Sequence, residues 1–382
     1  MLRTGRWAAI WSAATPRHLP KSAVLPRGYV NRGGVPDQVA RETSDNSENP
    51  GAAGAPMIVD SVLGLSEPWV LHHGDVLAAP RAAFCLVGPK DAPVVAVLGG
   101  ISAHRFLIAP DGWWPQVVGP HLGVDSSRFR ILGIDYLGGL GASSTPGGES
   151  PGGPRFPPLS SFDQAEVLQR VAQHLGLRSL HAIVGASYGG MVALAFAARH
   201  PDSVDRIVIV SAADRAQVLS TAWRSVQRQI VREAIARGNG PAGLKLARAL
   251  AMATYRSKAE FAVRFGGPPV RDAERFRFPV EGYLFARGDD YVQKYRAESF
   301  LALSESIDLH NVDASQVRTP ATLVAVREDQ LVPFDDMERL AARLAGPRQL
   351  VEINSIYGHD AFLKESAVLN PILRRALAET TP

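Results

Sequence analysis

The chain has 382 residues, of which 46% are hydrophobic and 20% charged, and its formal net charge at pH 7 is +4. This balance is typical of a globular protein with one large domain or two small ones, and the dispersed Lys and Arg residues exclude the basic patch of a nucleic-acid-binding protein. The single cysteine, Cys85, excludes an internal disulfide, and the sequence has no run of 18 apolar residues that would predict a membrane span.

Residues 1–56 differ in composition from the rest of the chain. They are rich in Pro, Gly, Ser, Ala and Arg and lack periodicity, so they cannot bury enough apolar surface to offset the entropy of ordering, and we expect disorder. The first 35 residues carry six Lys or Arg and no acid, which fits a transit peptide. We favour the simpler interpretation of an upstream-start artefact or an unselected tail, because the globular pattern begins at Met57.

From residue 57 onward, apolar runs typical of buried strands alternate with stretches of helical periodicity. Strands alternating with helices predict an α/β fold with a mostly parallel sheet covered by helices on both faces. The expected strands lie within 92–100, 129–135, 180–186, 204–213, 320–329 and 348–360, and the expected helices between them lie within 160–177 and 189–201.

Residues 214–316, here called the insertion, interrupt this alternation. Three stretches, "AQVLSTAWRSVQRQIVREAIARG", "GLKLARALAMATYRS" and "YVQKYRAESFLALSESIDL", predict helices with no convincing strand between them. We expect the insertion to form a helical lid over the carboxyl edge of the sheet, where open α/β sheets bind ligands. The core is then divided into a first part, 57–213, and a second part, 317–382.

The stretch "AIVGASYGGMVALAFA" joins a predicted strand to a predicted helix through Gly185, Ser187 and Gly189. A strand followed by G-x-S-x-G and a helix is the pattern of a nucleophile elbow, in which a strained turn exposes the serine and glycines let strand and helix approach closely. The alternative is a tight turn without catalytic function, but such a turn does not require serine at its apex. We therefore predict that Ser187 is a catalytic nucleophile.

A serine nucleophile needs a base, and the base needs an orienting acid that precedes it in the chain for this pattern. Of the histidines after the serine, His200 ends a predicted helix and His310 lies in the insertion. His359 follows a predicted strand near the end of the chain, in "YGHDAFL", and is the expected base. Glu328 and Asp329 both come directly after the strand within 320–329 and are the candidates for the acid.

An oxyanion hole needs two backbone N–H groups. The residue after the nucleophile, Tyr188, supplies the first in this arrangement, and the loop "LGGISAH" after an earlier strand offers Gly99 and Gly100 for the second. No metal site is predicted, because the histidines are scattered and no pair has ligand spacing beside a carboxylate.

Several motifs together resemble the homoserine O-acyltransferase family of α/β-hydrolase-fold enzymes over most of residues 60–378. They are "GASYGGMVAL" at the elbow, "GWW…VGP" and "YLGGLGASSTP" in core loops, "VQRQIV" and "TYRSKAEFAVRFG" in the insertion, and "YGHDAFL" near the end. The resemblance implies the α/β-hydrolase fold, and its spacing to Pro333 favours Asp329 as the acid.

The reaction implied by this resemblance is a ping-pong acyl transfer. Ser187 takes an acetyl or succinyl group from acyl-CoA, His359 and Asp329 handle the proton, and the hydroxyl of L-homoserine then accepts the acyl group in methionine biosynthesis. Arg228 and Asp360 match the family positions that hold the carboxylate and the ammonium of the amino acid. Arg228 has an alternative interpretation, a solvated charge on an amphipathic helix. No bound cofactor is implied, since acyl-CoA is a substrate.

The sequence departs from the family in "LGGIS", which lacks the usual threonine, and in "KYRAESFLAL", which has Arg296, Glu298 and Phe300 at family Asp, Asn and Tyr positions. These changes leave the acyl donor open, and they leave homoserine or serine open as acceptor. His104 and Arg105 offer positive charge for a succinyl carboxylate or, equally, a surface role.

Two other functions remain open from the sequence, an esterase that uses the same serine and a non-catalytic scaffold. Intact serine, acid and histidine candidates argue against the scaffold, and the motifs of the insertion argue against the esterase. Finally, the resemblance implies a cytoplasmic homodimer that associates through helices of the insertion, with no nucleic-acid or membrane partner.

Overall fold

The computed structural model describes residues 57–378 except 66–67, 109–111 and 147–155. The segment 1–56, for which we expected disorder, lies outside the described residues. Eight strands form one sheet in the order β1-β4-β8-β5-β9-β10-β13-β14. Their bounds are β1 Met57–Gly64, β4 Arg81–Gly88, β5 Val94–Leu98, β8 Arg130–Ile134, β9 Ala182–Ala186, β10 Ile207–Val210, β13 Ala321–Val326 and β14 Arg348–Ile353.

The sheet is parallel from β8 through β14, and only β1 and β4 pair antiparallel with their neighbours. This confirms the predicted α/β class and its mostly parallel sheet. Short paired strands lie outside this sheet, namely β2 (Trp69–Val70) with β3 (Val76–Leu77), and β6 (Val118–Gly119) with β7 (Val124–Asp125).

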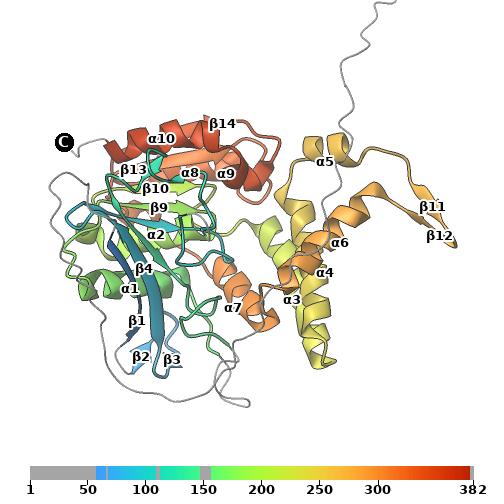
Figure 1. Cartoon of the computed structure of the whole chain (residues 1–382), viewed down its shortest axis with the longest axis horizontal. Coiled ribbons are helices and arrows are strands. Elements are labelled where there is room, and N and C mark those ends of the chain that lie inside the picture. The colour runs from blue at the N-terminus through green and yellow to red at the C-terminus, as the bar shows by residue number, and fades with distance from the viewer. Residues whose placement is uncertain (1–56, 66–67, 109–111, 147–155, 379–382) are drawn as a thin grey trace, which may run out of the picture. The chain divides into compact units, whose positions relative to one another are not determined.

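Helices cover both faces of the sheet, as the wholly buried strands require. In β5, Val94, Ala96 and Leu98 pack with residues of α1 (Ser161–His174), α2 (Tyr188–Arg199) and α8 (Phe334–Arg343). The alternate residues Val95 and Val97 pack on the opposite side with α9 (Ala361–Lys364) and α10 (Ser366–Ala378). The period of two along a strand thus supplies one apolar core to each face, and Figure 1 shows α10 on one side of the sheet and α1 and α2 on the other.

The insertion lies between β10 and β13 and carries five helices among the described residues. They are α3 (Val218–Ala236), α4 (Gly240–Tyr255), α5 (Lys258–Phe265), α6 (Pro279–Val292) and α7 (Ala297–Asp308). Figure 1 shows them grouped at one side of the sheet. A small third apolar cluster joins α3, α4, α6 and α7 through side chains that include Val231, Leu244 and Tyr291.

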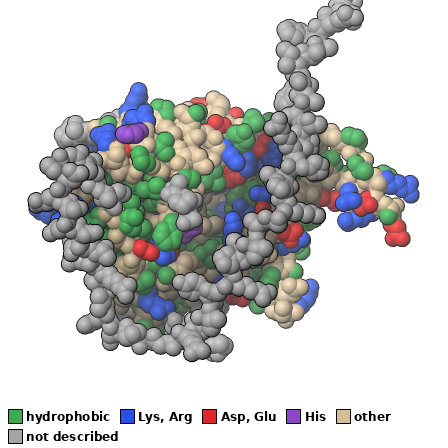
Figure 2. Space-filling view, viewed as in Figure 1, with side chains coloured by type: hydrophobic (Ala, Val, Ile, Leu, Met, Phe, Trp, Pro, Cys, Tyr) green, Lys and Arg blue, Asp and Glu red, His purple; other side chains and the backbone are tan. Residues whose placement is uncertain are grey.

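The prediction that the insertion lacks strands is wrong for residues 270–277. Strands β11 (Val270–Asp272) and β12 (Arg275–Arg277) pair antiparallel around a turn in which Ala273 has a φ of 46°. Their side chains are largely exposed, so this hairpin forms by local pairing without the buried face that a sequence pattern reveals. In Figure 1 the hairpin projects away from the helices, and Figure 2 shows charges of both signs gathered on it.

Three short 3₁₀ turns complete the described elements, η1 (Pro201–Ser203), η2 (Ala314–Gln316) and η3 (Gly358–Asp360). Within the described part of the chain, no helix is both long enough and apolar enough to cross a lipid bilayer.

Candidate active site

Ser187 stands at a sharp turn between β9 and α2, with φ 54° and ψ −122°, a backbone conformation that a non-glycine residue adopts only under strain. Two glycines make this turn possible. A Cβ on Gly185 would lie 2.3 Å from the carbonyl oxygen of Gly189, and a Cβ on Gly189 would lie 2.2 Å from that of Leu98. The strained serine and the close strand-to-helix approach are the geometry of a nucleophile elbow.

The structure brings Ser187, His359 and Asp329 together, although they are far apart in the sequence. Ser187 Oγ lies 2.8 Å from His359 Nε2, and His359 Nδ1 lies 2.7 Å from Asp329 Oδ2. The other candidate acid, Glu328, points elsewhere and accepts a hydrogen bond from the backbone N–H of Ser355 at 2.7 Å. The arrangement is therefore that of a serine, a base and an orienting acid, in which Asp329 is the acid.

The Asp329 carboxylate is fixed from both sides. Its Oδ1 accepts hydrogen bonds from the backbone N–H groups of Leu331 and Val332, which leaves Oδ2 for His359. Burial by itself lowers the pKa of His359, but the charge and hydrogen bond of Asp329 outweigh burial, and the pKa is raised above its ordinary value. A base of this kind is well matched to taking a proton from a hydroxyl near neutral pH.

The two other histidines after Ser187 have partners away from this site. His200 directly follows α2, and its Nε2 lies 3.0 Å from a carboxylate oxygen of Glu166 in α1. His310 is buried between Ser161 Oγ at 2.6 Å and the carbonyl oxygen of Ala213 at 3.0 Å, and burial lowers its pKa to about 4. Both ring nitrogens of His310 are therefore engaged in holding the insertion to the core.

The residues predicted for the oxyanion hole come from α2 and from the end of a strand next to β9. Tyr188 is the first residue of α2, so its backbone N–H is one of the helix N-terminal donors without an intrahelical acceptor. Gly99 and Gly100 follow β5, the strand that pairs with β9. A Cβ on Gly99 would lie 2.6 Å from the Trp113 ring, so glycine is required there by close packing.

A small cavity of about 50 Å³, partly open to solvent, lies beside Ser187 between the sheet and the insertion. Its walls are shared, since the core contributes the reacting side chains and the insertion contributes side chains of α3, α4 and α7. The lining includes Ser187, His359, Trp223, Arg224, Tyr255 and Ser304. Tyr255 also packs edge-on against the His359 ring, with ring centroids 5.7 Å apart.

The sequence reasoning missed Arg224, a cation in the cavity wall. Its guanidinium pairs with the Asp308 carboxylate, with Nη2 2.6 Å from Oδ1, and its side chain is 13% exposed. Its positive charge contributes a downward effect on the pKa of His359. The available signal was its spacing, because Arg224 precedes Arg228 by four residues and so lies on the same face of a helix.

Ser211 was also missed. Its side chain is 1% exposed, it lines the cavity, and its hydroxyl has no hydrogen-bond partner among the described residues. It follows β10 with a φ of 51°. A hydroxyl that is buried without a partner in a ligand cavity is available to a substrate.

Arg228 is not among the residues that line the cavity, but its hydrogen-bond partner Ser304 is. Its guanidinium donates to Asp308 Oδ2, to the carbonyl oxygen of Ser304 at 3.0 Å and to Ser304 Oγ at 3.1 Å. The side chain is 9% exposed, so the alternative interpretation of a solvated surface charge is wrong. Its contact with a substrate stays a prediction.

Asp360 is beside His359 but already has a cationic partner. Its Oδ2 lies 2.8 Å from Arg256 Nε, an ion pair without the alignment of a hydrogen bond, and Arg256 also pairs with Glu260. Asp360 helps to raise the pKa of His359. Its contact with an ammonium group stays a prediction.

Arg105, one of the two cations considered for a succinyl carboxylate, is bound on the core side. It pairs with Asp60 and Asp135, each at 2.6 Å. His104 accepts from the backbone N–H of Phe106, and neither side chain is among those that line the cavity. The cations among the described residues that line the cavity are Arg215 and Arg224.

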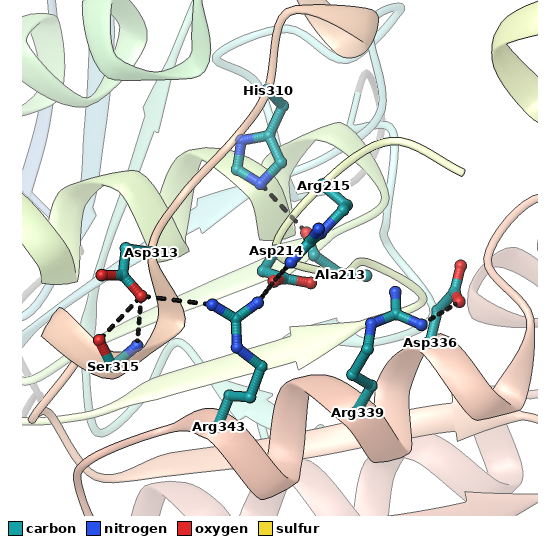
Figure 3. Close-up of polar contacts among 9 residues, drawn as sticks. All are labelled: Ala213, Asp214, Arg215, His310, Asp313, Ser315, Asp336, Arg339 and Arg343. Carbon is teal, nitrogen blue, oxygen red and sulfur yellow. Dashed lines mark hydrogen bonds and ion pairs between the residues drawn. The ribbon is translucent and has the colours of Figure 1, made fainter. Parts of the chain in front are cut away.

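Two further lining residues, Arg215 and Asp336, belong to a group of charged side chains drawn in Figure 3. The wholly buried Asp214 accepts from Arg215 at 3.1 Å and from Arg343 at 2.7 Å, and Asp336 pairs with Arg339 at 2.8 Å. The charges of this group are thus mutually compensated. In the described part of the chain, no group of three or more His, Cys, Asp or Glu side chains is placed to hold a metal ion.

Comparison with known proteins agrees with this geometry. The alpha/beta hydrolase fold family model matches residues 93–366. The solved homoserine O-acetyltransferase of Bacillus anthracis superposes with a TM-score of 0.77, at 16% identity over 86% of this chain and 99% of that one. The predicted α/β-hydrolase fold is therefore confirmed.

Two relatives are similar in sequence over most of their length. The homoserine O-succinyltransferase of Xanthomonas campestris pv. campestris is 41% identical over 78% of this chain and 79% of its own. The homoserine O-acetyltransferase of Thermobifida fusca is 30% identical over 82% of this chain and 93% of its own. With the fold, the serine elbow and these relatives together, the chain belongs to the homoserine O-acyltransferase family of α/β-hydrolase-fold proteins.

Proposed function

We propose that this protein is an acyl-CoA-dependent O-acyltransferase that acylates the side-chain hydroxyl of L-homoserine in methionine biosynthesis. The observation that carries the proposal is the contact of Ser187 Oγ with His359 Nε2 at 2.8 Å, inside a cavity walled by the insertion. The sequence relationship to enzymes named for acetyl and succinyl transfer to homoserine supports the acceptor.

In the first half-reaction, Ser187 Oγ attacks the thioester carbonyl of acyl-CoA while His359 Nε2 takes the hydroxyl proton. The backbone N–H groups of Tyr188 and of Gly99 or Gly100 stabilise the oxyanion of the tetrahedral intermediate. When the intermediate collapses, the carbon–sulfur bond breaks, the CoA sulfur receives the proton from His359, and an acyl ester remains on Ser187.

In the second half-reaction, the hydroxyl of the amino acid attacks this ester and His359 takes its proton. The bond to Ser187 Oγ breaks, His359 returns the proton to that oxygen, and the O-acyl amino acid leaves. Asp329 stabilises the imidazolium form of His359 in both halves. No bound cofactor is needed, since CoA enters and leaves as part of the donor.

We propose succinyl-CoA rather than acetyl-CoA as the donor. A succinyl group carries a carboxylate that must be paired when it leaves water, and Arg224 is the more buried of the two arginines that line the cavity. Arg224 and Arg228 share the single carboxylate of Asp308, so positive charge remains beside the cavity. The relative from Xanthomonas campestris, named for succinyl transfer, supports this choice.

For the acceptor, we retain Arg228 and Asp360 as the proposed groups for the carboxylate and the ammonium. In a ping-pong reaction the succinyl group is still on Ser187 when homoserine arrives, so a second cation is needed besides Arg224. Arg228 lies one helical turn away on the same face of α3. Direct contact of Arg228 with the homoserine carboxylate requires that its ion pair with Asp308 opens. If the ion pair stays closed, Arg228 attracts the carboxylate only through its charge.

The protein is further proposed to act in the cytoplasm as a homodimer that associates through the insertion. The cytoplasm holds the acyl-CoA donors. Large apolar side chains are exposed on the insertion, among them Val218 and Val263, each 82% exposed, and Phe276, 55% exposed. Exposed apolar surface of this kind is typical of association sites. Sedimentation equilibrium of the purified chain tests this, and a monomer at micromolar concentration contradicts it.

The test of function is CoA release by the purified full chain, with acetyl-CoA and succinyl-CoA each offered to L-homoserine and to L-serine, and mass spectrometry of the product. We expect O-succinyl-homoserine to predominate. CoA release that needs no amino acid identifies a hydrolase instead and overturns the proposal. Predominance of the acetyl product overturns only the choice of donor.

The donor assignment has a matched pair of variants on α3. Removing a charged hydrogen-bonding partner costs about 1.5–3 kcal/mol, so Arg224→Gln is expected to raise the KM for succinyl-CoA about 10- to 100-fold while that for acetyl-CoA stays within about threefold. Arg232→Gln removes the same charge from a half-exposed position 4.0 Å from Glu305 and is expected to change neither. If Arg224→Gln changes the KM of both donors equally, Arg224 does not bind the succinyl carboxylate.

A further inference from the structure

The loop after β5 is held by tyrosine hydroxyls. Three consecutive carbonyl oxygens accept hydrogen bonds, that of Gly99 from Tyr136 at 2.8 Å, that of Gly100 from the N–H of Ala103 at 2.8 Å, and that of Ile101 from Tyr295 at 2.8 Å. In addition, Ser102 Oγ lies 3.0 Å from the hydroxyl of Tyr291. Tyr136 belongs to the core, whereas Tyr291 and Tyr295 lie in and just after helix α6 of the insertion.

Fixing these carbonyl groups also fixes N–H groups. A trans peptide is planar and its C=O and the following N–H point in opposite directions. The bond to Gly99 O therefore sets the direction of the Gly100 N–H, one of the proposed oxyanion donors. The bond to Ile101 O likewise sets the direction of the Ser102 N–H at the far end of the same turn.

The tyrosines of the insertion are themselves rigidly packed. The rings of Tyr291 and Tyr295 are stacked with centroids 4.9 Å apart, and the two residues are 9% and 4% exposed. The Arg248 guanidinium lies 4.6 Å from the Tyr291 ring and 5.2 Å from the Tyr255 ring, and Tyr255 contacts His359 edge-on. One packed group of side chains thus touches both the oxyanion loop and the base.

The other proposed oxyanion donor is attached to the insertion in the same way. The hydroxyl of Tyr188 lies 2.6 Å from Ser306 Oγ in α7. Tyr188 also packs edge-on against Tyr136, with ring centroids 5.1 Å apart. Both sides of the oxyanion hole therefore contact helices of the insertion through tyrosine side chains.

We infer that Tyr291 and Tyr295 are positioning residues that hold the loop from Gly99 to Ser102 in the geometry needed for oxyanion stabilisation. The insertion then takes part in the chemical step as well as in covering the cavity. This inference rests on the proposed acyl-enzyme at Ser187. Neither tyrosine is among the residues that line the cavity, so each is expected to act through the backbone that it holds. Small displacements of oxyanion donors are expected to lower the rate of the chemical step.

The test compares Tyr295→Phe and Tyr291→Phe with Tyr283→Phe in the full chain. Tyr283 is on the same helix, and its buried hydroxyl has no hydrogen-bond partner among the described residues, so its removal is a matched control. We expect Tyr295→Phe to lower kcat about tenfold with the KM of both substrates changed less than about twofold, and Tyr291→Phe to lower kcat less. Tyr283→Phe should keep the wild-type kcat.

A second readout does not depend on which substrates are right. A fluorophosphonate probe labels an activated serine by attack of Ser187 Oγ on phosphorus with loss of fluoride, and its reaction also develops an oxyanion. Labelling should slow in Tyr295→Phe by about the same factor as kcat. Melting temperatures are measured in parallel, and rates are taken well below the lowest of them.

Equal kcat and equal labelling rates for Tyr295→Phe, Tyr291→Phe and Tyr283→Phe overturn the inference. An increase in KM without a change in kcat also overturns it, since that places the tyrosines in binding. Failure of the wild-type chain to transfer acyl groups overturns the proposed function instead. The labelling rates of the three variants decide the inference in that case as well.

Discussion

Helix α2 of the core and helix α3 of the insertion bury opposite kinds of side chain. Every residue of α2 from Tyr188 to Ala197 is buried, and none of them is charged. In α3, a helix of 19 residues, the buried ones are Ser220, Gln227, Arg228 and Val231, three of them polar. The first helix is placed by apolar packing, whereas the second buries polar groups that must each find a partner.

This difference corresponds to a division of labour at the site. The reacting groups Ser187, Asp329 and His359 all come from the core and are held by strand ends and tight turns. Of the polar side chains buried in α3, Ser220 and Gln227 both line the cavity, and Ser220 Oγ also donates a hydrogen bond to the carbonyl oxygen of Leu331. Under the proposed function, the core carries out the chemistry and the insertion selects the substrates and positions the oxyanion loop.

The largest expected effect is that of Ser187→Ala, which removes the nucleophile from the core. Acyl transfer with either donor should fall to background, a loss on the order of 10⁶-fold in kcat, because every later step needs the acyl ester. The melting temperature should hold or rise, since alanine adds no strain that serine lacks and removes only one hydroxyl. CoA release and thermal unfolding measure the two effects.

The Ser187→Ala result distinguishes the core from the insertion only when it is compared with that of Arg224→Gln. The core variant should remove all transfer whatever the donor, while the insertion variant should change the preference between donors. Measurable turnover by Ser187→Ala, once contamination with wild-type enzyme is excluded by mass spectrometry, contradicts the covalent mechanism.

The next effect in size is that of Asp329→Asn. The carboxylate raises the pKa of His359 against burial, so the neutral base is lost as the pH falls through a midpoint above the ordinary histidine pKa of 6.5. With asparagine the pKa of His359 should fall, and the acidic limb of the kcat/KM profile should move to lower pH. At the plateau, kcat should drop by about 10⁴-fold, because the imidazolium formed in each step loses its partner.

The matched control is Glu328→Gln, the neighbouring carboxylate that binds the backbone of Ser355. It should leave both the plateau and the pH midpoint close to those of the wild type. An acidic limb that stays in place in Asp329→Asn shows that the limb reports another group.

The core could be predicted from the sequence, and so could the serine and histidine that the structure brings together, because their signals are local. Buried strands read as apolar runs, the elbow needs glycines within two residues of Ser187, and His359 follows a strand. The choice between Glu328 and Asp329 was different, because adjacent residues share the local strand signal and only the family spacing to Pro333 favoured Asp329. In the structure the two are separated by the direction of each side chain.

The insertion could not be predicted to the same depth. Three helical stretches were predicted, but the described residues of the insertion hold five helices, and most of α6 was missed. Arg224, Tyr291 and Tyr295 make their polar contacts with residues that are distant in the sequence. Tyr295 and Ile101 are 194 residues apart. The hairpin over 270–277 buries no face, so it has no hydrophobic period that a sequence pattern could reveal.

The smallest effect tests the comparison of the two regions directly, by making the same substitution in each. Val192 in α2 is wholly buried and Val263 in α5 is 82% exposed. Valine to alanine gains up to about 0.5 kcal/mol of helix propensity at both positions, but at Val192 the loss of two buried methyl groups costs about 1–3 kcal/mol. Denaturant unfolding should therefore show Val192→Ala destabilised and Val263→Ala unchanged or slightly stabilised. A clear loss of stability in Val263→Ala would mean that its side chain is buried in the assembled protein, which would support association through the insertion and correct the picture of an exposed face.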